Sequence, residues 1–292
     1  MSHVTRRDFF KTAAVASMAA PAVAATKRSA TDMVTLGKTG VQVTRLAFGT
    51  GTFAGKLNRE MGQEAFTRNV RHAYDRGIRW FETADAYAQM HQMLAVALKG
   101  IPRDTIQLST KIRLREGDND PRAIIDRVRK EAATEYFDIL LMHGMGTAKW
   151  PDEQKQLMDA LSEAKSKKIA RAIGISHHGM LPLGACVGNN WLEVDLCRIN
   201  HSGARMDSVV NTPTENGDVD EVVSLLKKVH GQGTTVLGMK LIAEGRFTKA
   251  EDREASLKFV MKLGTVDAVT IGCKSTDEID EAIERINRNL NA

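Results

Sequence analysis

Four residues with side chains able to transfer protons follow apolar runs along this chain. Glu82 ends the run IRWFE, and Tyr87 comes five positions after it. Lys111 lies near the end of the next apolar run, IQLSTKI, and His143 near the end of the one after, FDILLMHG. Ionisable groups make poor core material, so their repeated placement at the ends of apolar runs indicates a site.

The types of these residues suit the protonation of a carbonyl oxygen. A free tyrosine has a pKa near ~10, and lowering it by ~2 units needs ~2.7 kcal/mol. One ammonium about 4 Å away supplies on the order of 4 kcal/mol at an effective dielectric near 20. We therefore expect Lys111 to lower the pKa of Tyr87, Glu82 to hold Lys111, and His143 to orient the carbonyl. None of these residues supplies a hydride, and a nicotinamide cofactor is the natural source.

Apolar runs alternate with helical spacing along the body of the chain. We predict a glycine-containing hairpin over 33–43 and strands at 43–51, 78–84, 106–112, 137–144, 169–176, 192–200, 234–240 and 268–273. We predict helices at 61–76, 90–99, 121–134, 152–168, 218–230, 251–263 and 277–289. This alternation predicts an α/β fold, a (β/α)8 TIM barrel with an N-terminal β-hairpin, over residues 33–290. A doubly wound open sheet is the alternative, but no G-x-G-x-x-G follows the first strand.

The barrel gives the four residues a common location. Active sites of such barrels lie at the carboxyl ends of the strands. Glu82, Lys111 and His143 end the second, third and fourth predicted strands, and Tyr87 lies in the loop after the second. The same end carries Gly272, Lys274 and Ser275 before a helix, and this arrangement is suited to binding an anion.

Several motifs resemble the aldo-keto reductase family. One is the FETADAY stretch, and three more are the residues TK, H and GIS at or near the ends of predicted strands. The others are the leading segment LGKTGVQVTRLAFGTG and the closing segment TIGCKSTDEIDEAI. The resemblance extends from residue 33 to about residue 290 and implies an NADPH-dependent barrel reductase, with NADH as a possible second cofactor. It implies that Tyr87 is the acid, with Lys111 and His143 as its partners.

The resemblance also assigns cofactor contacts. It implies that Lys274 and Ser275 contact the adenosine 2′-phosphate and that Glu281 contacts adenine. Lys240 would add a pyrophosphate contact, while Gly49 and Thr50 let the backbone approach the cofactor. Ser176 and His177 occupy the positions of the family's Ser-Asn pair, which holds the nicotinamide carboxamide.

The chain departs from the family pattern at several of these positions. The usual aspartate five residues before the tyrosine is Glu82, and Asp85 is a nearby carboxylate that we rank lower on spacing. The usual glutamine of the sixth strand is Leu196, and the usual asparagine after Ser176 is His177. The arginine common in the phosphate loop is absent.

The N-terminus resembles an export signal. Paired arginines, Arg6 and Arg7, precede Phe9, Phe10 and Lys11, and then come a modest apolar stretch and an A-V-A site at residues 22–24. We expect residues 1–24 to be a cleavable twin-arginine-type signal peptide, which implies the twin-arginine export machinery as a partner and a periplasmic location. The apolar stretch is too short to anchor the chain stably in a membrane.

Composition excludes some functions. The net charge is +5, residues 1–24 contribute +2, and the remaining 5 − 2 = +3 is mildly basic without a Lys/Arg block. Nucleic acid is therefore not expected as a partner. The three cysteines form no C-x-x-C motif, and no metal site is expected.

Two other functions compete with a carbonyl reductase. A nicotinamide-binding barrel with weak or no turnover fits the altered carboxylate and nicotinamide contacts. A metal-dependent hydrolase would use His143, His177, His178 and His201, but these histidines lack the spacing of a ligand set.

Overall fold

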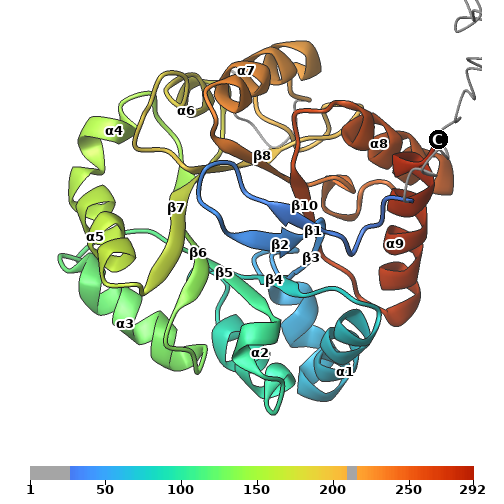
Figure 1. Ribbon diagram of the computed structural model, residues 1–292, viewed down its shortest axis with the longest axis horizontal. Coiled ribbons are helices and arrows are strands. Elements are labelled where there is room, and N and C mark those ends of the chain that lie inside the picture. Colours follow the sequence, from blue (N-terminus) through green and yellow to red (C-terminus); the bar gives the residue numbers. More distant parts are fainter. Residues whose placement is uncertain (1–26, 209–215) are drawn as a thin grey trace, which may run out of the picture.

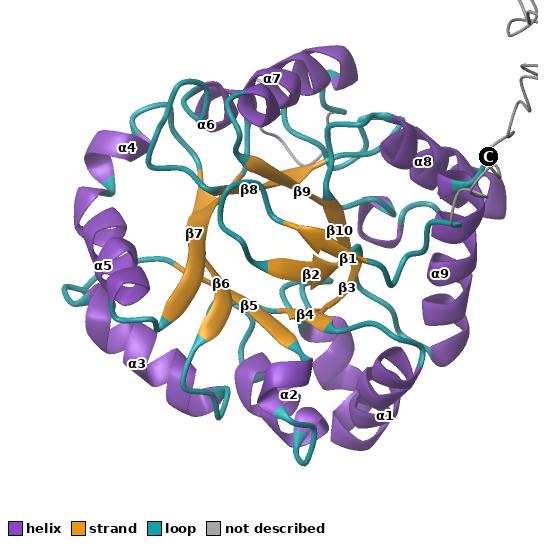
Figure 2. Ribbon diagram, viewed as in Figure 1, coloured by secondary structure: helices purple, strands orange, loops and turns teal. Residues whose placement is uncertain are grey.

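The computed structural model describes residues 27–208 and 216–292, and their strands build a closed barrel (Figures 1 and 2). Its order is β10-β3-β4-β5-β6-β7-β8-β9, and every neighbouring pair is parallel. The strands are β3 (Leu46–Gly49), β4 (Trp80–Glu82), β5 (Gln107–Ile112), β6 (Phe137–Met145), β7 (Ala170–His177), β8 (Val194–Arg198), β9 (Thr235–Met239) and β10 (Ala268–Ile271). Closure confirms the predicted (β/α)8 barrel and rules out the open sheet.

Helices surround the barrel, as Figure 2 shows. They are α1 (Lys56–Asp75), α2 (Met90–Leu98), α3 (Pro121–Glu131), α4 (Trp150–Glu153), α5 (Lys155–Ser166), α6 (Met180–Gly184), α7 (Val219–Gly231), α8 (Ala250–Lys262) and α9 (Thr276–Leu290). Each predicted helix has a counterpart, but the segment 152–168 is divided into α4 and α5, and α6 lies in a connection predicted to be short. None of the helices in the described ranges has the length and apolar character needed to span a bilayer.

The hairpin β1 (Met33–Thr35) and β2 (Gln42–Thr44) blocks the amino end of the barrel. Leu36, Val41 and Val43 belong to the same apolar cluster as barrel residues such as Trp80 and Leu141. The Thr44 hydroxyl accepts the backbone N–H of Trp80, the first residue of β4, at 3.1 Å. Because this apolar hairpin closes the amino end of the barrel, a site can open at the carboxyl ends of the strands.

Local sequence features fix where several helices begin and how closely two strands approach. Capping side chains start three of the helices: Asp120 accepts the Arg122 N–H, Asp218 that of Glu221, and Ser275 that of Glu278. Gly174 permits the close approach of β7 to β8, because a Cβ there would lie 1.9 Å from the carbonyl oxygen of Val194. These features fix the starts of α3, α7 and α9 and the close spacing of β7 and β8.

Candidate active site

A buried ion pair lies at the carboxyl ends of the adjacent strands β4 and β5. Glu82 is 4% exposed and Lys111 is 2% exposed, and the Lys111 ammonium contacts Oε1 of Glu82. The ammonium also donates to the Thr83 carbonyl at 3.1 Å, and the Thr270 hydroxyl donates to Glu82 Oε2 at 3.4 Å. Two buried charges are tolerated because each is paired and further hydrogen-bonded.

The other candidate carboxylate, Asp85, faces different cations. Its side chain accepts from Arg127 at 2.8 Å and from Arg115 at 3.2 Å. Only its backbone N–H meets Lys111, by donating to the Lys111 carbonyl at 2.9 Å. Glu82 is therefore the residue whose carboxylate contacts Lys111.

Tyr87 and His143 complete the group around the lysine. Their rings meet edge to face, with centroids 5.5 Å apart and an interplanar angle of 89°. The Lys111 Nζ lies 5.0 Å from the centroid of the Tyr87 ring. The absence of a side chain at Gly51 leaves room for the phenol of Tyr87, because a Cβ there would lie 2.8 Å from the Tyr87 hydroxyl. The structure therefore brings together all four residues singled out by the sequence.

The electrostatics of Tyr87 differ from the sequence-based expectation. Burial raises the pKa of Tyr87 well above its usual value, the negative charge of Glu244 raises it further, and the positive charge of Arg198 opposes this. The expectation that Lys111 lowers this pKa is therefore not confirmed: its ammonium lies 5.0 Å from the centroid of the ring, and desolvation of the phenolate outweighs the positive charge of Arg198. Tyr87 is a neutral phenol at neutral pH and is equipped to donate a proton.

Burial also controls the two neighbours of Tyr87. Burial and then the charge of Lys240 lower the pKa of Lys111 to about 7, while its contact with the Glu82 carboxylate favours the ammonium. Burial, followed by the charge of Lys111, lowers the pKa of His143 well below its usual value. His143 is therefore a neutral imidazole, suited to hydrogen-bonding an oxygen and not to competing as the acid.

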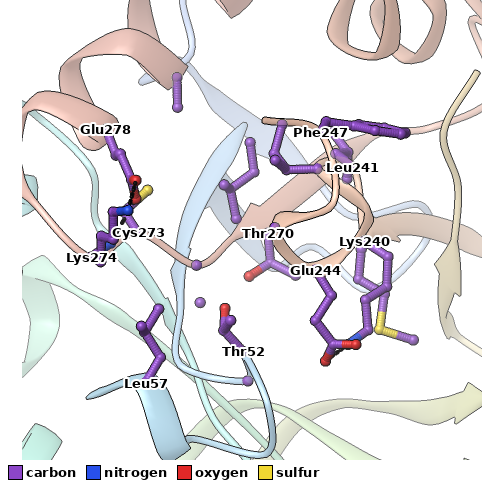
Figure 3. A pocket seen from close by; sticks show the side chains of 18 of the residues that line it. Thr52, Leu57, Lys240, Leu241, Glu244, Phe247, Thr270, Cys273, Lys274 and Glu278 are labelled. Atoms are coloured by element: carbon purple, nitrogen blue, oxygen red, sulfur yellow. Dashed lines mark hydrogen bonds and ion pairs between the residues drawn. The ribbon is translucent and has the colours of Figure 1, made fainter. Parts of the chain in front are cut away.

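A cavity of about 480 Å³ opens beside the tetrad, by which we mean Glu82, Tyr87, Lys111 and His143. Figure 3 shows other residues of its wall. Among its lining residues are eight predicted site residues: Gly49, Glu82, Tyr87, Lys111, Lys240, Gly272, Lys274 and Glu281. The cavity extends from Tyr87 to the segment between β10 and α9. It therefore joins the proton donor to the predicted anion-binding loop.

The far end of the cavity has the donors that a phosphorylated nucleotide needs. Lys274 lies beside the start of α9, 3.5 Å from Glu278, and Figure 3 shows these two side chains together on one wall. Arg253 of α8 and Arg285 of α9 also line the cavity, and the Glu281 carboxylate holds them at 2.8 and 2.7 Å. Each of these three cations also pairs with a carboxylate, so a dinucleotide phosphate would share them with Glu278 and Glu281 beside the N-terminus of α9.

A second ion-pair group lies in the cavity wall beyond β9. Lys240 donates to Glu244 at 2.6 Å, and Arg205 contacts the same carboxylate at 2.5 Å (Figure 3 shows Lys240 and Glu244). The backbone N–H of Phe53, in the loop after β3, also donates to Glu244 at 3.3 Å. Glu244 thus links the loops that follow β3, β8 and β9.

The remaining predicted contacts lie off this cavity. Thr50 is fully buried, and its N–H donates to the Glu82 carbonyl at 3.0 Å. The Ser176 hydroxyl accepts the Gly144 N–H at 3.0 Å, and the Ser275 hydroxyl caps α9. These side chains support the strand ends and the helix start, and their contacts with a cofactor stay predictions.

His177 lies on the outer side of β7, between two aspartates. Its Nε2 is 3.0 Å from Asp195 and its Nδ1 is 3.1 Å from Asp207, and all three side chains are fully buried. Burial by itself would lower the pKa of His177, but the two carboxylates outweigh this effect and raise the pKa to about 10. The imidazolium therefore neutralises the carboxylates, and the structure does not place His177 on the cavity.

Four functional candidates were not found from the sequence. Leu196, assigned to the glutamine position, belongs to the apolar barrel interior, and the polar residue that ends the same face of β8 is Arg198. The alternation of Val194, Leu196 and Arg198 was a usable signal. Arg253, Arg285 and Glu244 approach the cavity from helices or long loops, which strand-end motifs do not reveal.

The metal-hydrolase alternative finds no support in the described part of the chain. The groups there with the spacing of metal ligands are His177 with Cys186 and Asp195, and Asp85 with His91 and Glu131. Neither group contains His143, His178 or His201. The four histidines required by that alternative therefore do not come together.

Comparison with known proteins identifies the family of this chain. Residues 45–292 match the model of the "Aldo/keto reductase family". The chain belongs to the aldo/keto reductase family. Its relatives include "Probable aldo-keto reductase 1" of Glycine max, 30% identical over 49% of this chain and 48% of the relative. Another is the methylglyoxal reductase DkgB of Escherichia coli O157:H7, 31% identical over 45% of this chain and 47% of that protein.

The aldo/keto reductase chain thus spans about half the length of the curated relatives it matches. A solved aldo-keto reductase from Klebsiella pneumoniae, in complex with NADPH, superposes with a TM-score of 0.65. That structure is 14% identical, and the match covers 89% of this chain and 90% of the other. At this identity the comparison establishes the shared barrel fold.

The buried His177 group predicts a stability change with a defined pH dependence. Replacing His177 by Asn leaves two buried carboxylates without a cation, and should lower the free energy of unfolding by about 3–5 kcal/mol at pH 7. The folded pKa of about 10 exceeds the usual 6.5, so the native state holds an extra proton between these values. The stabilisation is therefore complete below about pH 6.5 and is lost as pH rises through about 10.

Urea unfolding of wild type and His177→Asn between pH 6 and 10 measures this difference. The stability gap between the two proteins should narrow as pH rises. His72→Asn is the control, because His72 pairs with Asp280 at a partly exposed site and should cost at most about 1 kcal/mol. A gap that is absent, or that does not change with pH, would show that His177 is not a buried imidazolium.

Proposed function

We propose that this protein reduces an aldehyde or ketone with NADPH, and that Tyr87 is the general acid. The observation that carries the proposal is one continuous cavity with Tyr87 and Lys111 at one end and Lys274, Arg253 and Arg285 at the other. A proton donor for a carbonyl and a set of phosphate-binding cations are the two requirements of such a reaction.

The tetrad residues have distinct roles in this proposal. NADPH, when bound, supplies the hydride to the carbonyl carbon. Tyr87 donates its phenolic proton to the carbonyl oxygen, and the neutral imidazole of His143 hydrogen-bonds the same oxygen. The Lys111 ammonium stabilises the phenolate that remains, and Glu82 keeps that ammonium in position.

The cofactor contacts follow the cavity wall. Gly272 and the start of α9 would hold phosphate through backbone N–H groups, and Lys274 would add charge-assisted hydrogen bonds. Arg253 and Arg285 would add guanidinium donors on the same wall, which they share with the Glu281 carboxylate. Gly49 and Lys240 line the same wall, while the contacts of Thr50, Ser176 and Ser275 with a cofactor stay predictions. The positive charge of Lys274 at this end favours NADPH over NADH.

The relatives support this function. The solved Klebsiella pneumoniae structure is described as a complex with NADPH, and one curated relative is a methylglyoxal reductase. Both point to NADPH and to small carbonyl compounds as the first substrates to assay. A competing proposal, cofactor binding with little turnover, draws on the raised pKa of Tyr87 and on Glu82 in place of the usual aspartate.

Replacing Tyr87 by Phe should lower kcat for reduction of methylglyoxal by about 100-fold or more, because the phenolic proton donor is removed. NADPH binding, followed by its fluorescence, should persist, because the cations at the far end are untouched. Tyr74→Phe is the control: Tyr74 lies on α1, where its hydroxyl meets Thr105, so turnover should not change.

The same assay separates the competing proposals. Wild-type protein that binds NADPH but reduces no member of a carbonyl panel would favour the low-turnover alternative. Equal turnover in wild type and Tyr87→Phe would reject the assigned acid, and no NADPH binding at micromolar concentration would reject both proposals.

We also propose that residues 1–24 form a twin-arginine-type signal peptide and that the barrel acts in the periplasm. These residues lie outside the described part of the chain, so the proposal rests on Arg6, Arg7 and the A-V-A site.

Replacing Arg6 and Arg7 together by Lys should retain the protein in the cytoplasm with its N-terminal segment uncleaved. Cell fractionation and the mass of the purified protein measure both effects in a host with a twin-arginine translocase. Arg28→Lys, beyond the cleavage site, is the matched control and should be exported normally. Export of the double variant at the wild-type level would contradict this assignment.

A further inference from the structure

Arg198 ends β8 on the face that lines the barrel interior. Val194 and Leu196, four and two positions earlier, belong to the interior apolar cluster, and side chains alternate along a strand. Arg198 pairs in register with Met239 of β9, which lines the cavity. The guanidinium therefore belongs to the mouth of the barrel, where the tetrad lies.

The hydrogen-bonding capacity of Arg198 is largely unused. Its side chain is 16% exposed, and its ion pair with Asp207 is long, at 3.5 Å. Asp207 is already engaged by His177 at 3.1 Å and by the Gly179 N–H at 2.8 Å. The buried Nε of Arg198 has no hydrogen-bond partner among the described residues. A guanidinium has five N–H donors, so most of them remain available to a ligand.

The position of Arg198 relates it to the proton donor. In the barrel order β8 lies four strands from β4 in either direction, so the two strands face each other across the mouth. The charge of Arg198 lowers the pKa of Tyr87, which follows β4, and Tyr87 acts on Arg198 in return. A molecule whose carbonyl meets Tyr87 can therefore extend across the mouth toward Arg198.

The cofactor's phosphates have other partners. Lys274, Arg253 and Arg285 belong to the segment after β10 and to helices α8 and α9. β8 is separated from β10 by β9. This separation assigns Arg198 to the substrate end.

We propose that Arg198 binds a carboxylate of the substrate, and that the preferred substrates are anionic aldehydes or ketones such as oxo acids. A planar guanidinium matches the two oxygens of a carboxylate, and the partly buried site strengthens such a pair. This inference rests on the proposed function, because it names the substrate class of that site.

A matched pair of substrates tests it: 4-carboxybenzaldehyde and methyl 4-formylbenzoate share a reactive aldehyde and a shape but differ in charge. With purified protein and NADPH, wild type should prefer the acid. Arg198→Gln should lower the ratio of kcat/KM for acid over ester by about 30-fold or more, mainly through a higher KM for the acid. Arg198→Lys, which retains the charge, should retain part of the preference.

The control is Arg205→Gln. Arg205 also lies near the mouth, but Glu244 occupies its guanidinium at 2.5 and 3.0 Å. Lys240 still pairs with Glu244 in this variant, so the acid-to-ester ratio should change far less than in Arg198→Gln. An equal loss in Arg205→Gln would assign the preference to general positive potential and overturn the proposal. Equal losses for acid and ester in Arg198→Gln, with weaker NADPH binding, would assign Arg198 to the cofactor and also overturn it.

A binding measurement keeps this inference separable from the proposed function. Calorimetric titration of 4-(hydroxymethyl)benzoate and of its methyl ester into protein with NADP⁺ needs no turnover. Tight binding of the acid that is lost in Arg198→Gln supports the proposal even if neither aldehyde is reduced, in which case the reductase function alone fails. Equal binding of acid and ester to wild type overturns the assignment of Arg198.

Discussion

The contact between Glu82 and Lys111 is the interaction on which the site depends. Placing a carboxylate and an ammonium in the mouth of an apolar barrel costs several kcal/mol per ion before pairing. The adjacency of β4 and β5 places the two at contact distance, and Thr83 and Thr270 complete their hydrogen bonding. The ammonium is then held beside the ring of Tyr87, with His143 on the edge of the same ring. Without the carboxylate, burial would favour the neutral amine, and the positive charge beside the phenol would be lost.

Further charged groups tie the loops of the barrel mouth together. The Asp195–His177–Asp207 group fastens β7 to β8 and to the loop beyond β8. Glu244, held by Lys240 and Arg205, links the loop after β9 to the loop after β3. The acids of these groups are thus matched by cations, and Arg198 adds a guanidinium whose ion pair with Asp207 is long, at 3.5 Å. The same charged groups therefore stabilise the mouth of the barrel and surround Arg198, on which the inferred substrate selectivity depends.

The sequence revealed the barrel, the tetrad and much of the cavity wall, because strand ends in this fold converge by necessity. The FETADAY stretch and the strand ends in TK and in H were sufficient to predict that Tyr87, Lys111 and His143 lie together. Residues such as His177 and Arg198 were harder to place, because a one-residue difference in register turns a side chain from the interior to the outside of the barrel. Arg253 and Arg285 were missed because helices deliver them. The raised pKa of Tyr87 depends on its burial, which residue spacing alone does not reveal.

The most direct test of this account removes the ion pair without leaving a buried charge. The double variant Glu82→Gln, Lys111→Met replaces both ions with neutral side chains of similar size, so that the fold should persist. The measurement is the single-turnover rate of NADPH oxidation by a carbonyl substrate after NADPH is bound. The account predicts a fall of about 100-fold or more with NADPH binding intact. A single-turnover rate equal to that of wild type would contradict the claim that this ion pair supports proton donation by Tyr87.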